Sequence, residues 1–225
     1  MAEKIALFDF CETLANFQTA DAYVKYVCEN VSSPSIVRKQ RIHSWLYRHQ
    51  VVRLVNRFFP RLYFNKRLFL WRLKGLKEEM LNNLAKGYYD NVVKPNLISE
   101  VIDILREKQN DGYTIYIVSA GYEIYLNYFA EDYDIPRKNI ISDKIAFNNG
   151  ICQGRLLDGE IMFKKTKELD RIIDKSHTYS EAYSDSMTDL PLLQWANKGV
   201  VIRQIDKSWA HDYGFDEILW RRWKD

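Results

Sequence analysis

The sequence predicts an α/β protein in which a Rossmann-like core with a parallel sheet carries an inserted, all-helical cap domain. Short β-prone runs alternate with helical patterns over most of the chain, and this alternation is typical of parallel strands joined by right-handed helical crossovers. Residues from about 20 to 89 show only amphipathic helical patterning. A chain of 225 residues is long enough for one sizeable core and a small insertion.

The chain begins with a predicted strand, which the insertion follows. The apolar run KIALFDF at residues 4–10 indicates a buried parallel strand with Asp9 near its C-terminal end. We expect residues 1–18 and 90–225 to form the core and residues 19–89 to form the cap. In the cap, Pro60 is expected to end or kink a helix whose arginines share one face at four-residue spacing: Arg53, Arg57 and Arg61.

After the insertion, strand and helix signals alternate to the end of the core. The sequence Asn149-Gly150 lies between two β-compatible runs and predicts a type I′ hairpin within residues 141–157. Helical spacing and β-prone runs define the other elements. We expect helices at residues 97–106, 165–173 and 190–196, and strands at residues 113–119, 179–183 and 199–202.

Composition excludes several classes of protein. With 47% apolar and 28% charged residues, the chain is not a disordered tail. It has no apolar run of the roughly 18 to 20 residues needed to cross a bilayer. Its three cysteines are too scattered for a disulfide framework or a zinc site, and we expect Cys28 and Cys152 to be packing residues. The N-terminus lacks a signal-peptide pattern, so a cytoplasmic location is expected.

Polar residues lie where the predicted strands end. In a doubly wound sheet, ligands bind beyond the carboxyl ends of the strands, and Asp9, Ser119, Asp185 and Asp189 are placed there. The three acids form a set of hard oxygen ligands suited to Mg²⁺. Lys165 begins a helix between them in sequence. A carboxylate nucleophile, a hydroxyl, a lysine and a metal ion are the parts needed to hold and attack a phosphoryl group.

Four motifs in order resemble those of the haloacid dehalogenase (HAD) superfamily. They are FDFCETL at residues 8–14, IVSAG at residues 117–121, Lys165, and YSDSMTDLPLL at residues 183–193. The fourth motif and the helical insertion are similar to those of the phosphoserine phosphatase-like branch. The resemblance spans roughly residues 4 to 205 and implies a HAD-type core with a helical cap.

The resemblance implies roles for the residues of the reacting centre. Asp9 would be the nucleophile and form an aspartyl-phosphate. Ser119 would bind the phosphoryl oxygens, helped by the amides of Ala120 and Gly121. Lys165 would neutralise the nucleophile and the phosphate. The substrate would be a small phosphorylated molecule.

The resemblance also implies a Mg²⁺ site. Asp9 and Asp185 would be ligands, with Asp189 in support and the backbone carbonyl of Cys11 completing the set. Thr13 would order the loop after the first strand. For Asp189 the alternative is that it caps the helix at Leu190, as Ser119 could cap the helix that follows it. Lys164, beside Lys165, is an alternative for the lysine.

Cys11 departs from the family pattern, because the phosphatases of the family have a second aspartate at this position for proton transfer. General acid–base catalysis contributes about 10²- to 10⁴-fold. A thiol with an ordinary pKa of about 8.5 is protonated at neutral pH, so it can donate a proton but is a poor base toward water. Glu12 is the nearest alternative acid.

Three interpretations of the Cys11 replacement stay open. The first is a working phosphatase with altered leaving-group chemistry. The second is phosphonate or C–halogen hydrolysis. Dehalogenation needs no Mg²⁺, so the presence of Asp185 and Asp189 argues against it. Phosphonate cleavage would need a cap lysine that forms a Schiff base, and the candidates are Lys66, Lys74 and Lys77. The third is a catalytically weak scaffold that acts as a binding module.

The net charge of +3 is the sum of two regions of opposite sign. Residues 36–86 hold thirteen lysines and arginines against two acids, a balance of +11, and the rest of the chain carries −8. The simplest interpretation is a solvated helical face. The alternatives are recognition of an anionic group beyond the reacting phosphate, or peripheral contact with an anionic membrane. The chain contains no recognised nucleic-acid motif, so nucleic acid is not an expected partner.

Overall fold

The computed structural model describes residues 3–59, 64–205 and 207–220. Its core is a parallel sheet of six strands in the order β3-β2-β1-β6-β7-β8. This confirms the predicted α/β class with a parallel sheet. The strands are β1 (Glu3–Phe8), β2 (Thr114–Tyr122), β3 (Ile140–Asp143), β6 (Thr178–Ser184), β7 (Lys198–Arg203) and β8 (Asp216–Leu219).

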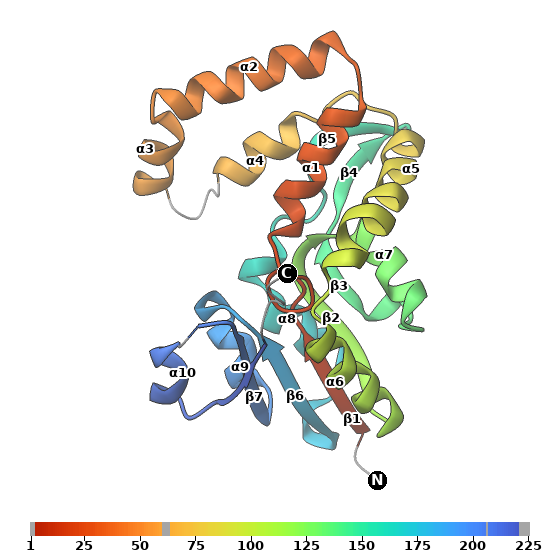
Figure 1. The fold of residues 1–225 in the computed structure, drawn as a ribbon, viewed down its shortest axis with the longest axis vertical. Helices are drawn as coiled ribbons and strands as arrows, with labels where there is room; N and C mark the ends of the chain where they lie inside the picture. The colour runs from red at the N-terminus through yellow and green to blue at the C-terminus, as the bar shows by residue number, and fades with distance from the viewer. Residues whose placement is uncertain (1–2, 60–63, 206, 221–225) are drawn as a thin grey trace.

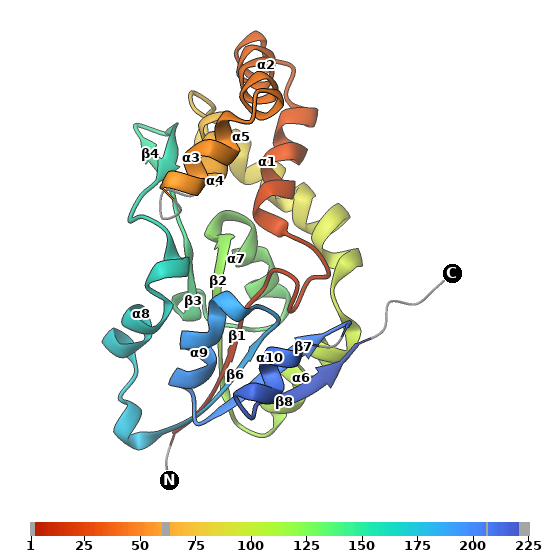
Figure 2. The same cartoon turned by 90° about the vertical axis from the view of Figure 1, so that its left-hand side faces the viewer.

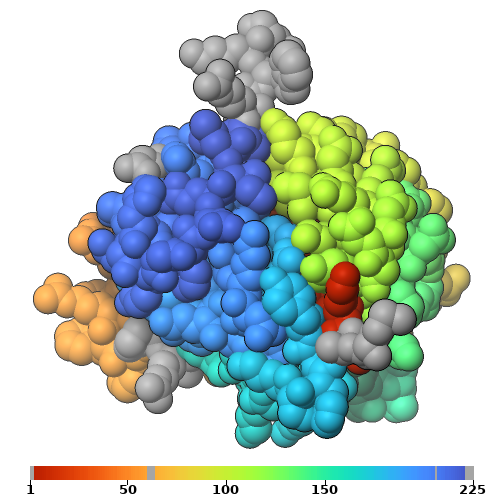
Figure 3. Space-filling model, turned by 90° about the horizontal axis from the view of Figure 1, so that it is seen from below, coloured from red at the N-terminus to blue at the C-terminus, as the bar shows by residue number. Residues whose placement is uncertain are grey.

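Strand β1 is buried on both faces of this sheet. Its alternate residues belong to two apolar clusters, Ala6 and Phe8 to one and Ile5 and Leu7 to the other. Both faces of a parallel strand are covered by helices, which explains why its sequence is continuously apolar. Seen from below, only the start of β1 reaches the surface, beside α6 (Figure 3).

Helices lie against each face of the sheet. The cluster around Phe8 includes residues of α6 (Ser99–Asn110) and α7 (Glu123–Asp132). The cluster around Leu7 includes residues of α8 (Lys165–Ile172), α9 (Leu190–Trp195) and α10 (Ser208–Asp212). Sequence patterns predicted α6, α8 and α9. They did not separate α7, α10 and the edge strands β3 and β8.

The described residues between β1 and α6 form five α-helices. They are α1 (Thr19–Asn30), α2 (Pro34–Arg48), α3 (Val51–Phe58), α4 (Phe64–Trp71) and α5 (Glu78–Tyr88). Helices α1 and α5 approach the core, whereas α2 and α3 lie at the end of the molecule farthest from the sheet (Figures 1 and 2). Pro60 and Arg61 lie outside the described residues. Along the described ranges, no helix has the length and apolar character needed to cross a bilayer.

A β-hairpin from the second half of the chain joins the helical segment. Strands β4 (Ile145–Asn148) and β5 (Ile151–Leu156) are connected through Asn149 and Gly150, whose φ angles of +47° and +71° are those of the predicted type I′ turn. The backbone NH of Gly75 donates to the carbonyl of Cys152 over 2.9 Å. The hairpin is thus hydrogen-bonded to the loop between α4 and α5, a contact that the sequence did not predict.

Gly154 allows the hairpin to lie this close to α4. Its φ of +66° favours glycine, and a Cβ at this position would lie 2.7 Å from the Cβ of Lys74 and 3.1 Å from the Cα of Trp71. A larger residue would force the hairpin away from the helices. The hairpin and the segment around α4 thus pack together although they are distant in sequence.

Candidate active site

The predicted site residues lie at the carboxyl ends of three adjacent strands. Asp9 follows β1, Ser119 lies in the last part of β2, and Asp185 follows β6. Strand β1 pairs with β2 on one side and with β6 on the other, and all three are parallel. Their C-terminal ends therefore meet at one edge of the sheet, below the helical segment.

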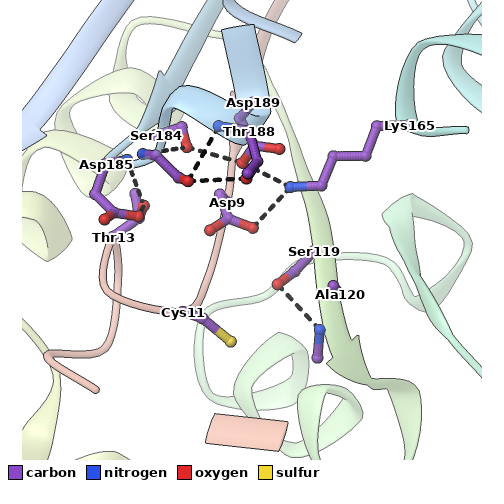
Figure 4. Close-up of polar contacts among 12 residues, drawn as sticks. Asp9, Cys11, Thr13, Ser119, Ala120, Lys165, Ser184, Asp185, Thr188 and Asp189 are labelled. Atoms are coloured by element: carbon purple, nitrogen blue, oxygen red, sulfur yellow. Dashed lines mark hydrogen bonds and ion pairs between the residues drawn. The ribbon is translucent and has the colours of Figure 1, made fainter. Parts of the chain in front are cut away.

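Lys165 joins two carboxylates at this edge (Figure 4). It is the first residue of α8, and its Nζ lies 2.9 Å from Asp9 Oδ1 and 2.7 Å from Asp189 Oδ2. Asp189 Oδ2 also accepts a hydrogen bond from the Ser184 hydroxyl over 2.8 Å. Asp189 makes no side-chain cap for α9. The neighbouring Lys164 instead donates to the backbone carbonyl of Asp158.

The electrostatics of this cluster follow from burial. Burial raises the pKa of Asp9 to about 6; Lys165 acts against this, and the charges of Asp189 and Asp185 add to it. For Lys165, burial alone would lower the pKa, but Asp9 and Asp189 outweigh it, so the pKa is raised and the ammonium stays charged. One buried cation therefore lies between two acids, which leaves an excess of negative charge at the centre.

Thr13 and Lys207 hold Asp185 in place. The backbone NH of Asp185 donates to Thr13 Oγ1 over 3.0 Å, and the Thr13 hydroxyl lies 3.3 Å from Asp185 Oδ1. Lys207 Nζ lies 3.2 Å from Asp185 Oδ2 and also donates to the Asp185 carbonyl. The sequence reasoning missed Lys207. It follows β7, so the strand-end rule that found Asp9 would have found it too.

Cys11 lies in the wall of the site, with its thiol in a chain of hydroxyl groups. Its Sγ shares a hydrogen bond of 3.0 Å with Thr19 Oγ1, which in turn lies 2.7 Å from the Tyr125 hydroxyl. Burial, followed by the charge of Asp9, raises the pKa of the Cys11 thiol. The thiol is therefore protonated at neutral pH and is not a base.

Glu12 is exposed and does not line the cavity described below. It has a φ of +59° and accepts a hydrogen bond of 2.5 Å from the Gln18 amide. Glu12 is thus near the site, and its charge adds to the effect of burial in raising the pKa of Asp185, but its carboxylate is hydrogen-bonded outside the cavity lining. Gln18 itself lines this cavity.

The three residues of the second motif face different neighbours. Ser119 is buried, and its Oγ accepts a hydrogen bond of 3.2 Å from the Gly121 amide. The Ala120 carbonyl accepts one of 2.7 Å from Lys66 Nζ. At Gly121 a Cβ would lie 2.7 Å from the Tyr125 hydroxyl. Ser119 and Ala120 line the cavity, whereas the structure places Gly121 behind Ser119, against the Tyr125 that contacts Thr19.

A cavity of about 270 Å³ lies over this edge of the sheet. Asp9, Ser119, Lys165, Asp185 and Asp189 line it from the core. From the helical side it is lined by residues that sequence motifs did not identify as a set: Gln18, Ala20, Asp21, Asn65 and Lys66. Among the described cap lysines considered from the sequence, Lys66 lines the cavity and Lys74 and Lys77 do not.

Lys66 connects the helical segment to the core. Its Nζ lies 2.5 Å from Asp143 Oδ2 and 5.5 Å from the centre of the Tyr122 ring. Burial raises the pKa of Asp143, and Lys66 opposes that shift. Because the Asp143 side chain is fully enclosed at the end of β3, this ion pair fixes α4 over the carboxyl edge of the sheet.

The residues present fit a Mg²⁺ ion. Among the described residues, no three acidic, histidine or cysteine side chains form a ready-made metal cluster. Mg²⁺ needs no such cluster, since it keeps several waters and binds through one or two carboxylates plus substrate phosphate. Asp9 Oδ2 has no hydrogen bond to any described residue, Asp185 is close by in the same cavity, and the excess negative charge favours a divalent cation.

A family model for haloacid dehalogenase-like hydrolases matches residues 6–194. No curated protein matches the chain significantly. Among solved structures, a protein of unknown function from Bordetella pertussis Tohama I has a TM-score of 0.75 and 16% identity, covering 97% of this chain and 99% of that one.

Two further solved structures are phosphoserine phosphatase-like. A phosphoserine phosphohydrolase-like protein from Francisella tularensis subsp. tularensis SCHU S4 has a TM-score of 0.63 and 20% identity, over 96% of this chain and 94% of that one. A phosphoserine phosphatase solved as a phospho-aspartyl intermediate analogue has a TM-score of 0.54 and 17% identity, over 99% and 95%. At these identities the likeness shows a shared fold.

Proposed function

This chain belongs to the haloacid dehalogenase-like hydrolase family, and on that premise we propose that it is a Mg²⁺-dependent phosphatase that hydrolyses a phosphate monoester through an aspartyl-phosphate on Asp9. One observation carries the proposal. The Asp9 carboxylate, held by Lys165, lies in the same cavity as the Ser119 hydroxyl and the Asp185 carboxylate. A nucleophile, a hydroxyl group that can donate a hydrogen bond to the phosphate, and a metal-binding acid thus surround one space.

In the proposed reaction, Asp9 Oδ2 attacks the phosphorus atom and the bond to the ester oxygen breaks. The leaving alcohol takes a proton from a side chain of the site, for which Cys11 and Asp21 are the candidates, and water then attacks the phosphorus. The bond between phosphorus and Asp9 breaks, the proton of the water returns to the group that protonated the alcohol, and phosphate and the free Asp9 carboxylate are released. Lys165 keeps Asp9 ionised against the effect of burial and offsets charge on the phosphoryl oxygens. Ser119 donates a hydrogen bond to one of those oxygens. A bound Mg²⁺, held by Asp9, Asp185 and the Cys11 carbonyl, with Asp189 in support, would supply further charge neutralisation.

The protonated Cys11 thiol shapes the substrate preference in this proposal. The raised pKa makes this thiol a weaker acid than the carboxyl group it replaces, so it gives a proton to the leaving oxygen less readily. Reactions whose leaving group needs little protonation are therefore favoured, such as aryl phosphates over simple alkyl phosphates. Asp21 also lines the cavity, and burial raises its pKa, so it is a second candidate proton donor.

The cap, for which we propose residues 19–89 together with the β4–β5 hairpin, excludes water and selects the substrate. Lys66, Asn65 and Asp21 face the cavity from this side. They offer a cation, an amide and an acid to the part of a small substrate beyond its phosphate. Because this role depends on cap side chains, the fold alone does not define the substrate. The expected cytoplasmic location stays a prediction.

The proposal is tested by a phosphatase screen over phosphosugars, phosphoamino acids, nucleotides and lipid phosphates, with Mg²⁺ and with a chelator. We expect Mg²⁺-dependent release of phosphate, and binding of beryllium fluoride that depends on Asp9. Full activity of Asp9→Asn would overturn the aspartyl-phosphate.

A second hydrolytic reaction has weaker support. Phosphonate cleavage would use Lys66, the cap lysine in the cavity, as a neutral amine. Its Nζ is instead held by the Asp143 carboxylate and the Ala120 carbonyl, so it is not free to attack a substrate carbonyl. The binding-module interpretation predicts that no beryllium fluoride complex forms with Mg²⁺, so the same trapping experiment separates it from the enzyme.

A further inference from the structure

Helices α2 and α3 expose large apolar side chains at the end of the molecule far from the sheet (Figures 1 and 2). Trp45 is 56% exposed, Phe58 71% and Phe59 61%. Isolated apolar residues are normal on a surface, but a concentration in two adjacent helices marks an interaction site. We call residues 37–59 the distal face; its exposed apolar members are Val37, Ile42, Trp45, Tyr47, Leu54, Phe58 and Phe59.

All the charged side chains of the distal face are cationic. It contains no aspartate or glutamate, and its six basic residues are Arg38, Lys39, Arg41, Arg48, Arg53 and Arg57. The five arginines are exposed, and none forms an ion pair with any described residue. Their charges are thus available to a partner.

On α2 the basic and aromatic residues share one side. Arg38, Arg41, Trp45 and Arg48 follow each other at spacings of three, four and three residues, which places them along one helical face. The opposite side contacts the protein: Ile36 is buried, and the His43 ring lies 4.7 Å from the Phe69 ring. On α3, Arg53 and Arg57 are four residues apart and lie along one line of the helix. Leu54 and Phe58, also four residues apart, lie along the adjacent line.

We propose that the distal face docks onto an anionic membrane surface. Arginines beside an exposed tryptophan and phenylalanines are typical of helices that lie in the membrane interface, where cations meet anionic headgroups and apolar side chains enter the acyl boundary. Charge supports the same partner. Residues 36–86 carry +11 and the rest −8, so an anionic surface attracts the cap and repels the core, which orients the approach.

Other partners use only part of this face. Single-stranded nucleic acid would stack on aromatic rings, but Val37, Ile42 and Leu54 have no ring for a base. A second copy of the chain could bring its acidic core to the arginines, yet this would leave the exposed phenylalanines and tryptophan without an apolar partner. The lipid interface satisfies both sets at once.

This inference goes beyond the proposed catalytic function and does not depend on it. None of the described residues of the distal face lines the catalytic cavity. Docking is therefore measured by binding alone, whether or not the chain hydrolyses a phosphate.

The experiment is sedimentation of the full chain with vesicles of phosphatidylcholine alone and of equimolar phosphatidylcholine and phosphatidylglycerol. We expect binding to the anionic vesicles only, weakened by salt. Arg41→Ser with Arg48→Ser should weaken binding about fivefold for each lost charge. Trp45→Ser with Phe58→Ser should weaken it by about tenfold or more.

The matched control removes two exposed charges elsewhere, with Lys25→Ser on α1 and Lys138→Ser on the core. It should bind as the unaltered chain does. All the substituted residues are exposed, and thermal unfolding of each variant checks that the fold is kept.

Four results would overturn the proposal. The first three are absence of binding to both vesicle types, equal binding to both, and binding that the distal variants leave unchanged. The fourth is that the distal variants weaken binding of another partner instead of binding to vesicles. That partner would be single-stranded RNA, or a second copy of the chain detected as a concentration-dependent dimer by sedimentation velocity. Phosphatase assays on a soluble substrate report separately on the catalytic proposal.

Discussion

At the carboxyl edge of the sheet, Lys165 is buried between Asp9 and Asp189, whereas at the far end of the cap, five arginines of α2 and α3 face solvent without an acidic partner among the described residues. Buried charges need compensation within the protein, so the geometry of the first region defines its chemistry. Exposed charges are compensated by water, so the second region is understood only through an external partner. The same residue types therefore indicate catalysis in one region and docking in the other.

The largest expected effect is on phosphate release, which should depend on the carboxyl edge of the sheet and not on the distal face. Asp9→Asn removes the proposed nucleophile and should lower phosphate release by about 10⁴-fold or more. Removal of Arg41 and Arg48 should leave hydrolysis of a soluble phosphate ester unchanged. Steady-state phosphate release measures both, and Glu12→Gln is the control beside the site. A comparable loss of phosphate release in the arginine variant would mean that the distal face takes part in catalysis.

Stability provides the next test of the comparison. Lys165→Met would leave Asp9 and Asp189 as unpaired buried carboxylates and should lower the free energy of unfolding by about 3–5 kcal/mol. Arg41→Ser should change it by less than about 0.5 kcal/mol. Chemical denaturation in the presence of a chelator measures both. Equal effects would mean that Lys165 is solvated rather than locked between the acids.

The pH dependence of stability should also come from the buried region. The pKa of Asp9 is about 6 in the folded chain against an ordinary value of 3.8. The unfolded chain therefore ionises first, and this group lowers the free energy of unfolding as pH rises from about 4 to about 6, by up to about 3 kcal/mol. Asp9→Asn, compared with the unaltered chain in chelator, should gain relative stability over that range.

Mg²⁺ should reverse this difference, because it favours the ionised form of Asp9. We expect the unaltered chain to gain stability on addition of Mg²⁺ and Asp9→Asn to gain less, as measured by thermal unfolding at pH 7. A gap between the two proteins that stays constant from pH 4 to 7 would contradict the raised pKa of Asp9.

The smallest expected effect concerns the wall of the site. Cys11→Asp restores a carboxyl group for proton transfer next to Thr19 and should raise turnover of alkyl phosphates by about 10- to 100-fold. Aryl phosphates should gain less, because their leaving groups need less protonation. Cys11→Ser is the control for a change in size. Unchanged or lower alkyl phosphate turnover would mean that Cys11 does not limit the reaction, and Asp21→Asn then tests the other candidate proton donor.

Much of the catalytic edge could be predicted from the sequence, because it depends on local patterns. An apolar run ending in Asp9 forms a buried strand, and parallel strands bring their carboxyl ends together. Strand-end residues such as Ser119 and Asp185 could therefore be assigned to one site. The Asn149-Gly150 turn is local in the same way, since two positive φ angles are a property of the turn residues.

The cap side of the cavity could not be predicted in this way. Asp21, Asn65 and Lys66 lie in amphipathic helices, where a polar residue is placed by the rotation and packing of its helix rather than by a motif. Lys66 enters the cavity because Asp143, seventy-seven residues away in sequence, pairs with it. The position of the hairpin beside α4 likewise depends on the contact that Gly154 permits.

By itself, the sequence determined the α/β class, the position of Asp9 at a strand end and the charge asymmetry between residues 36–86 and the rest of the chain, since these follow from residue type, period and spacing. The resemblance of its four motifs to the HAD superfamily supplied the proposed role of Asp9 as nucleophile. The tertiary structure decided that Cys11 hydrogen-bonds to Thr19, that Glu12 does not line the cavity, and that Lys66 rather than Lys74 or Lys77 does. It also decided that the arginines and large apolar residues of α2 and α3 are exposed. These outcomes depend on contacts between distant segments and on burial, and both exist only in the folded chain.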